Sequence, residues 1–413
     1  MSVNPPQPVN VTTDSSVKAD REAVYLPPSE LALKYNKGLQ RPLAVQPHPS
    51  ASQAGSTKIK KIETFYVRPR WLFVRVETEG GVVGWGEGTL EGHTEAVQVL
   101  TLCRLIGWDA MNIEEIYTYL YRHRFYRGGE VLMSAMSGVD IALWDIKGKV
   151  LGVPVWELLG GKVRERCDVY GWVGGDRPSD VAEQAKVRKE QGFRFVKMNA
   201  TESIGWLDSP HALDDTVKRL AEVKAIGIDA GLPFFIEEPL LPGHVNELKD
   251  LYNKTNIPIA LGERLFTRLD VRPYLEAGCI DLIQPDIAHA GGISETKKIA
   301  IMAEAYDVGL APHCPLGPLA FAASLHVGFS TPNFVICEMS LKMHYNVGKD
   351  LLSYMLNPEV FDIENGSIGL LTAPGLGIEL NEDMIRKEAA EAAELEPWIN
   401  PLFRGEDGAM REW

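Results

Sequence analysis

Apolar positions in the second half of the chain fall into short continuous runs separated by longer periodic stretches. From Cys167 onward, the runs that read as buried strands are CDVYGWVG, FRFVKMN, AIGID, PFFIEE, IPIALGE, IDLIQPD, VGLAPH and FVICEM. Stretches such as PSDVAEQAKVRKEQG, RLDVRPYLEAG and GISETKKIAIMAEAYD separate most of them. Repeated strand–helix units with apolar strands predict an eight-stranded parallel α/β barrel of the TIM type. An open doubly wound sheet is less favoured, because no glycine-rich phosphate loop follows the first strand.

The pattern before residue 166 is different. Two alternating runs, residues 73–78 and 82–85, flank Gly80 and Gly81 and predict a hairpin. The helical patterns NIEEIYTYLYRHRF and VLMSAMSGVDIALWDIKGKVL follow it. We therefore expect four regions: a disordered extension (1–57), an α+β domain (58–165), a barrel domain (166–375) and a C-terminal segment returning to the α+β domain (376–413).

One junction departs from the strand–helix alternation. In GIDAGLPFFIEEP, two runs that both read as strands, residues 226–229 and 234–237, lie only a few residues apart. A crossover between parallel strands takes a dozen residues or more, usually as a helix. Residues 230–233 are too few for one, so we expect the third βα unit of the barrel to be truncated.

Composition narrows the class of partner. The net charge of −14 argues against nucleic acid or a membrane surface, because both require a basic face. It does not exclude a small acidic substrate bound in a locally cationic pocket. No apolar run is long enough to span a membrane, and the N-terminus lacks the apolar core of a signal peptide. Scattered cysteines without C-x-x-C spacing indicate free thiols in a reducing, cytoplasmic setting: Cys103, Cys167, Cys279, Cys314 and Cys337.

Polar residues end successive predicted strands. A single carboxylate at such a place has an ordinary explanation, because it can cap the next helix. Five successive strands that end in Glu, Asp or His are a stronger signal, since the carboxyl ends of barrel strands meet at one face. This pattern predicts an active site built from Lys197, Asn199, Glu237 or Glu238, Glu263, Asp286, His313 and Glu338.

The residue types at these strand ends indicate a metal and a base. Oxygen ligands from Glu237 and Glu263 suit a hard cation, most plausibly Mg²⁺, rather than zinc. Such an ion can hold a substrate carboxylate and stabilise the dianion formed when the α-proton leaves. Asp286 and His313 end adjacent strands, so the carboxylate can orient the imidazole as a general base.

Each of these residues also has a structural interpretation. His313 can be an ordinary hydrogen-bonded histidine beside CPLGP, and Asp286 can cap the following helix. Glu338 can hydrogen-bond a developing enediolate oxygen if protonated, or it can be a buried salt-bridge partner. Lys197 can be a lysine whose ammonium reaches out of the barrel to solvent.

Several longer motifs resemble the enolase superfamily, in its mandelate racemase/muconate lactonizing enzyme branch. They are SGVDIALWDIKGKVLGVPVWELLGG, FVKMN, FIEEP, LGER, LIQPDIAHAGGI and LAPHCPLGP. The closest likeness is to D-galactonate dehydratases, and it extends from about residue 58 to 413. The resemblance implies an α+β capping domain, a Mg²⁺-dependent barrel and loss of water from an acid sugar to give a 2-keto-3-deoxy acid. It also implies self-assembly, although no interface can be read from spacing.

The resemblance assigns roles residue by residue. Glu237 and Glu263 resemble the second and third metal ligands, and His313 with Asp286 resembles the dyad that removes the C2 proton. Glu338 resembles the residue that supports the transition state.

Other positions are expected to contact the sugar or to have no part in the chemistry. Lys197 and Asn199 fit the family's K-x-N pattern beside the substrate carboxylate. Arg127, with Arg124, can help a cap loop close over the sugar, although surface arginines would look the same. WDIKGK is interpreted as the packing of a cap helix on the barrel.

The resemblance fails at one place. Relatives carry an Asp-x-His motif after the third strand, in which Asp is the first metal ligand and His is the acid that protonates the departing hydroxyl. Here Asp229 is the one substitute for the ligand, Gly231 stands where the histidine would be, and His244 is a remote candidate for the acid.

Three interpretations stay open. The chain is an acid-sugar dehydratase, a catalytically impaired relative that still binds an acid sugar or assembles with intact subunits, or the product of a gene in which a coding segment was skipped. Racemisation is less favoured, because it needs a base on each face of the carbon. The aldonate is not fixed by the sequence.

Overall fold

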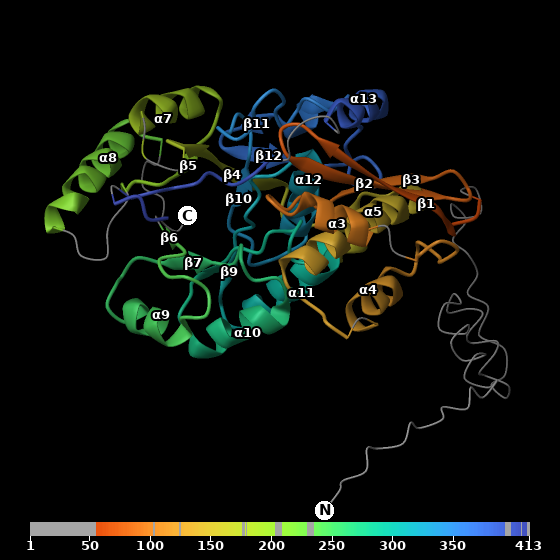
Figure 1. Cartoon of the computed structure of the whole chain (residues 1–413), viewed down its shortest axis with the longest axis horizontal. Coiled ribbons are helices and arrows are strands. Elements are labelled where there is room, and N and C mark those ends of the chain that lie inside the picture. The colour runs from red at the N-terminus through yellow and green to blue at the C-terminus, as the bar shows by residue number, and fades with distance from the viewer. Residues whose placement is uncertain are drawn as a thin grey trace, which may run out of the picture.

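The computed structural model describes residues 55–101, 104–123, 125–175, 178, 180–202, 209–228, 235–392, 398–405 and 407–410. Most of the predicted extension therefore lies outside the described residues. Figure 1 shows an antiparallel sheet with its helices, formed by the first part of the chain and here called the cap, beside parallel strands ringed by helices. No helix of the described residues is long and apolar enough to cross a membrane.

The cap is a three-stranded antiparallel sheet, in the order β1-β2-β3, covered by helices. The predicted hairpin is confirmed as β2–β3, and β1 precedes it. Glycines at positions 84, 86 and 138 let α5 lie directly against β3, since a Cβ at Gly86 would meet a helix carbonyl oxygen at 2.0 Å. The elements are β1 (Ile59–Val67), β2 (Trp71–Thr78), β3 (Val83–Glu87), α3 (Thr94–Thr101), α4 (Ile113–Arg122), α5 (Glu130–Leu151) and α6 (Val155–Leu158).

Asp145 on α5 joins the cap to a distant part of the chain. Its carboxylate accepts hydrogen bonds from the backbone N–H of Trp85, over 3.0 Å, and of Leu376, over 2.9 Å. Lys149, one turn later, lies 2.6 Å from the same carboxylate. These contacts confirm that WDIKGK has a packing role.

The parallel strands form two sheets that together make the wall of the barrel. One contains β10-β4-β5 and the other β6-β7-β8-β9, and a backbone bridge between Leu310 and Phe334 connects the second sheet to the segment before β10. An unpredicted hairpin, β11–β12, pairs antiparallel with β4. The strands are β4 (Arg166–Val173), β5 (Phe195–Met198), β6 (Ile236–Glu237), β7 (Ile259–Leu261), β8 (Leu282–Ile283), β9 (Gly309–Leu310), β10 (Cys337–Met339), β11 (Ile363–Glu364) and β12 (Ser367–Gly369).

Helices alternate with most of these strands, as predicted, and two short 3₁₀ segments accompany them. Helix α12, which follows β9, is buried along its whole length. It was not predicted, because it has no polar face. The helical elements are α7 (Val181–Glu190), η1 (Pro210–Leu213), α8 (Asp214–Ala225), α9 (Val245–Tyr252), α10 (Arg268–Ala277), α11 (Gly292–Glu304), α12 (Pro318–Phe329), η2 (Pro358–Phe361) and α13 (Glu382–Ala392).

We expected a strand at residues 226–229. Its described part, residues 226–228, does not form a strand, so that prediction is wrong. Residues 226–228 form the turn that ends α8: Gly227 adopts φ +67° and its N–H donates to the carbonyl of Lys224. Ile228 is buried in a cluster with Val181 and Val223 on the helices rather than in a sheet. Within the described ranges there are seven barrel strands instead of eight, and none lies between β5 and β6. Residues 229–234, with Asp229, lie outside the described residues.

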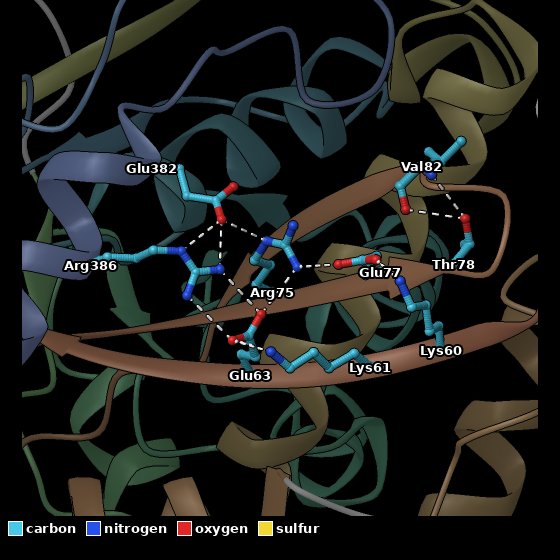
Figure 2. A network of polar contacts seen from close by, with 9 residues as sticks. All are labelled: Lys60, Lys61, Glu63, Arg75, Glu77, Thr78, Val82, Glu382 and Arg386. Atoms are coloured by element: carbon cyan, nitrogen blue, oxygen red, sulfur yellow. Dashed lines mark hydrogen bonds and ion pairs between the residues drawn. The ribbon is translucent and has the colours of Figure 1, made fainter.

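Helix α13, near the C-terminus, lies on the first strand of the cap. Figure 2 shows Arg386 of α13 paired with Glu63 of β1, over 3.3 Å, and Glu382 paired with Arg75 of β2, over 3.2 Å. Arg75 also bonds Glu77. Because these charges form a connected network, they hold the helix more firmly than isolated surface pairs would.

Candidate active site

Asp286 and His313 follow β8 and β9, and their side chains form a hydrogen-bonded pair. His313 Nδ1 lies 2.9 Å from Asp286 Oδ2, and Asp286 is fully buried. The other carboxylate oxygen, Oδ1, accepts the backbone N–H of Ala288 over 2.8 Å. Asp286 therefore braces its own loop with one oxygen and orients the imidazole with the other.

The second imidazole nitrogen of His313 faces two further carboxylates. Nε2 lies 3.1 Å from Glu263 Oε2 and 3.7 Å from Glu338 Oε2. Burial disfavours the charged imidazolium, but Glu263, Glu338 and the bond to Asp286 outweigh it and raise the pKa of His313 to about 10. The strand-end residues of β7, β8, β9 and β10 are thus in one cluster.

Lys197 of β5 joins this cluster from the opposite sheet. Its Nζ lies 2.7 Å from Glu237 Oε1, 3.7 Å from Glu338 Oε2 and 4.8 Å from the ring centroid of Trp172. Burial opposes its charge, but Glu237, Glu338 and Glu263 raise the pKa of the ammonium above its usual value. Lys197 therefore points into the barrel, not out toward solvent.

The side chains of Glu237 and Glu238 contact different partners. Alternation along the strand did not indicate which of the two lies in the cluster, and these contacts do. Glu237 faces Lys197 and is hydrogen-bonded to Glu263. Glu238 adopts φ +42° and pairs with Arg264. The first glutamate of the pair is the one inside the cluster.

The pKa values of Glu237 and Glu263 are shifted in opposite directions. Burial raises the pKa of Glu237 to about 7, reinforced by Glu263 and Glu338 and opposed by Lys197. Burial also disfavours ionised Glu263, but His313, Lys197 and Arg264 lower the pKa of Glu263 to about 2. Two adjacent carboxylates in a buried site repel each other when both are ionised, so their pKa values move apart.

This pair fits the donor preference of Mg²⁺. The ion takes oxygen ligands and commonly uses one or two carboxylates, with water and substrate completing its shell. Within the described ranges, no group of three His, Cys, Asp or Glu side chains has the arrangement of a metal site. Asp229, the candidate substitute for the missing ligand, lies outside those ranges.

Three candidates are not placed in the cluster. Asn199 is exposed at the end of β5. Arg127 is exposed on the cap, with its guanidinium carbon 5.9 Å from the ring centroid of Tyr121, and Arg124 lies outside the described residues. His244 is exposed and lies 3.8 Å from Glu247.

Three residues of the cluster were not singled out from the sequence. Trp172 and Tyr170 lie on β4, and Arg264 directly follows Glu263. The Tyr170 hydroxyl is buried with no hydrogen-bond partner among the described residues, and burial holds its pKa well above the usual value. Inward alternation on β4 is the signal that would have found both aromatic residues, because Tyr170 pairs in register with Glu338.

Two family models match the chain. One described as "Mandelate racemase / muconate lactonizing enzyme, N-terminal domain" matches residues 62–160, and one described as "Enolase C-terminal domain-like" matches residues 225–384. Among solved structures, the chain is similar to an enolase from Agrobacterium radiobacter bound to Na and L-malate. The TM-score is 0.74 at 29% identity, over 86% of this chain and 99% of that one. A member of the enolase superfamily from Salmonella Typhimurium gives a TM-score of 0.69 at 29% identity, over 80% and 98% of the two chains.

Proteins named D-galactonate dehydratase are similar in sequence. Those from Verminephrobacter eiseniae and Xanthomonas campestris pv. campestris are 45% and 46% identical to the chain over 384 residues, covering 86% of this chain and 100% of each relative. Since 86% of 413 residues falls well short of 384, each relative carries residues inside the match that this chain lacks.

Proposed function

The chain belongs to the enolase superfamily, in its mandelate racemase/muconate lactonizing enzyme branch, and is by family a hydro-lyase; on that basis we propose that His313 removes the C2 proton of D-galactonate or a related aldonate. Elimination of the C3 hydroxyl then gives a 2-keto-3-deoxy acid. The fold expected from the sequence, a cap with a TIM-type barrel, is the fold of the solved relatives.

The contact of 2.9 Å between His313 Nδ1 and Asp286 Oδ2 carries this proposal. Asp286 accepts the Nδ1 proton, and a cation on Glu237 and Glu263 would offset the carboxylates that raise the pKa of His313. The lone pair that then takes the substrate proton belongs to Nε2. Nε2 faces Glu263 and Glu338, so in this proposal the base acts on the side of the imidazole where the candidate metal ligand Glu263 lies.

Members of the enolase superfamily bind Mg²⁺, and Glu237 and Glu263 are the described residues that would hold it here. When bound, the ion supplies a positive charge that binds the substrate carboxylate and stabilises the dianion formed after proton loss. Asp229 is our candidate for a third oxygen ligand. With two described carboxylates instead of three, we expect weaker Mg²⁺ binding than in the longer relatives.

Side chains around the base bind and orient the substrate in this proposal. Lys197 offers an ammonium to the substrate carboxylate once Glu237 is neutralised by a cation. Glu338 bonds the N–H of Cys314 through Oε2, while its Oε1 is buried with no partner among the described residues. That free oxygen, when protonated, can donate to the enediolate. Asn199 and Arg127 are exposed, and we keep both as candidates for contact with the substrate.

A second function follows from the region between α8 and β6. Hydroxide is a poor leaving group, and a positioned general acid is worth about 10²–10⁴-fold in rate. Within the described ranges no barrel strand lies between β5 and β6, where the resemblance places the acid, and the relatives' match contains residues that this chain lacks. In the alternative function, the chain binds an acid sugar and exchanges its C2 proton without eliminating water.

One incubation separates these functions. The purified chain is mixed with D-galactonate and Mg²⁺ in deuterated water, and NMR follows C2 deuteration and formation of 2-keto-3-deoxygalactonate. Product formation supports the dehydratase, and deuteration alone, with C2 configuration retained, supports the alternative. Neither signal above that of a His313→Asn control would overturn both. Sequencing the transcript across codons 231–233 tests whether a coding segment was skipped.

We further propose a cytoplasmic location and self-assembly. The four cysteines within the described ranges are free and buried, which suits a reducing compartment: Cys167, Cys279, Cys314 and Cys337. Measuring the mass of the chain in solution tests the assembly.

A further inference from the structure

The segment that carries the proposed base, residues 313–317, is held within the barrel by hydrogen bonds from its neighbours. The N–H of Cys314 donates to Oε2 of Glu338 over 3.2 Å. The carbonyl of Leu316 accepts from the hydroxyl of Ser340 over 2.6 Å. Both partners come from β10 or from the residue that follows it.

Two further contacts to the same segment come from the cap. Nη2 of Arg70, a residue that is 1% exposed, donates to the carbonyl oxygen of Pro315 over 2.8 Å. The carboxylate of Glu87 accepts the N–H of Gly317 over 2.8 Å and the N–H of Ala320 over 3.0 Å. The base-bearing segment is thus fixed to the cap at two residues.

Glu87 serves as the N-terminal cap of α12, although it lies on β3 of the other domain. Gly317, at the N-cap position, has no side chain with which to satisfy the first N–H groups of the helix. Glu87 is fully buried and also accepts a hydrogen bond from Thr89 over 2.9 Å. A carboxylate at a helix N-terminus is favoured by the helix dipole as well as by these bonds.

Gly317 packs closely against the carboxylate of Glu87. A Cβ at position 317 would lie 2.8 Å from both carboxylate oxygens of Glu87 and 3.0 Å from the ring of Trp71. A residue with a side chain therefore does not fit at position 317, and the segment cannot move away from the cap without losing two hydrogen bonds.

We propose that Glu87 and Arg70 are positioning residues through which the cap sets the place of His313 in the barrel. The role of His313 as the base rests on the proposed function. The placement of His313 by the cap rests only on the contacts of Arg70 and Glu87. A displacement of about 1 Å in a reacting group can cost about 10²-fold in rate, so a rigid link to the cap has catalytic value.

The test observes His313 directly in the full chain without substrate. The chain is labelled with ¹⁵N-histidine, and NMR detects the proton shared between His313 Nδ1 and Asp286, assigned by its loss in His313→Asn. Glu87→Gln keeps the size of the side chain, but its amide must present an NH₂ group to one of the two N–H donors. We expect the His313 signal to shift or broaden in this variant.

Asp145→Asn is the matched control. Asp145 is also a buried carboxylate of the cap that accepts two backbone N–H groups, but its partners lie far in sequence from residues 313–317. We expect Asp145→Asn to leave the His313 signal unchanged. Arg70→Lys, which keeps the charge but cannot reach the Pro315 carbonyl in the same geometry, is the second variant if Glu87→Gln does not fold.

Two results would overturn the proposal: a folded Glu87→Gln or Arg70→Lys chain with the wild-type His313 signal, or the same change in Asp145→Asn. Circular dichroism establishes folding in each case. If the wild type exchanges the C2 proton, we also expect Glu87→Gln to lower the exchange rate at saturating substrate about 10-fold or more, with KM unchanged. If the wild type shows no exchange, the proposed function fails while the NMR result still decides the placement.

Discussion

The ammonium nitrogen of Lys197 lies 2.7 Å from Oε1 of Glu237, and both side chains are largely withdrawn from solvent. Lys197 is also within 3.7 Å of Glu338, so one cation serves two buried carboxylates. Lys197 therefore does part of the work of charge neutralisation that a divalent cation would do at this site.

Replacing Lys197 with Met should destabilise the chain and make its stability depend on Mg²⁺. Removing one partner of a buried ion pair costs about 3–5 kcal/mol when the other charge stays buried, and less where the remaining carboxyl takes up a proton, as Glu237 can. Mg²⁺ bound to Glu237 and Glu263 would restore charge balance, so thermal unfolding should show a larger rise in Tm on adding Mg²⁺ for Lys197→Met than for the wild type.

Arg264→Met is the control for this comparison. Its partner is Glu238, and its side chain is 43% exposed, so the loss should be at most about 1 kcal/mol. Equal Mg²⁺ responses in Lys197→Met and Arg264→Met would contradict the role given to Lys197.

His313→Asn and Asp286→Asn should both slow C2 proton exchange. The first removes the base and should cost about 10²–10⁴-fold, and the second removes the acceptor that fixes the imidazole tautomer. NMR of D-galactonate in deuterated water measures both rates. Exchange at the wild-type rate in His313→Asn would assign the base to another residue.

The stability difference between wild type and Asp140→Asn should change with pH. Asp140 on α5 is buried and accepts bonds from Ser294 Oγ and N at the start of α11. Burial raises the pKa of Asp140 from 3.8 to about 7, with Ser294 opposing. The protonated carboxyl thus contributes stability below about pH 4 that is lost as the pH rises toward 7, by at most about 1.4 kcal/mol per unit.

Urea unfolding of the two chains at several pH values measures this difference. Asparagine can reproduce the neutral carboxyl, because the Ser294 hydroxyl can accept as well as donate. The variant should gain stability relative to the wild type between pH 4 and 7, on the scale set by the pKa shift of Asp140. A constant difference across this range would mean that Asp140 is ionised in the folded chain.

Gly317→Ala should destabilise the chain by overpacking. The φ of Gly317, −82°, suits alanine, so the cost comes from the contacts with Glu87 and the ring of Trp71 and should be about 1–3 kcal/mol. Glu87→Asp shortens the opposing side chain, so the double variant should be more stable than the sum of the two losses predicts. Denaturant titrations of all four chains give the coupling, and additivity would disprove the steric account.

The cluster could largely be predicted because it is built from strand ends. Glu263, Asp286, His313 and Glu338 each close an apolar run, and parallel strands bring such ends together whatever the lengths of the helices between them. Alternation alone did not decide between Glu237 and Glu238, since Glu238 adopts a positive φ that breaks it, and the prediction of Glu237 came from the resemblance.

Helix α12 and the turn at Gly227 show why parts of the fold escaped prediction. A helix buried on every side has no polar face, so residues 318–329 carry no period of 3.6. Residues 226–229 look like a strand because Ile226 and Ile228 are apolar, but α8 runs up to them and Gly227 ends it. The role of Glu87 depends on Gly317, a partner that no local pattern identifies.

The hydrogen bonds between Glu87 and the start of α12 restrict how the two domains can be exchanged between relatives, in evolution or by design. Each half of this contact is encoded in a different domain, so neither domain is a self-sufficient module. A chimera that joins the cap of one relative to the barrel of another must keep an acceptor at position 87 and a residue without a side chain at position 317. Recombination at the boundary between the two domains that fails to keep both residues would leave the first N–H groups of the buried helix α12 without an acceptor.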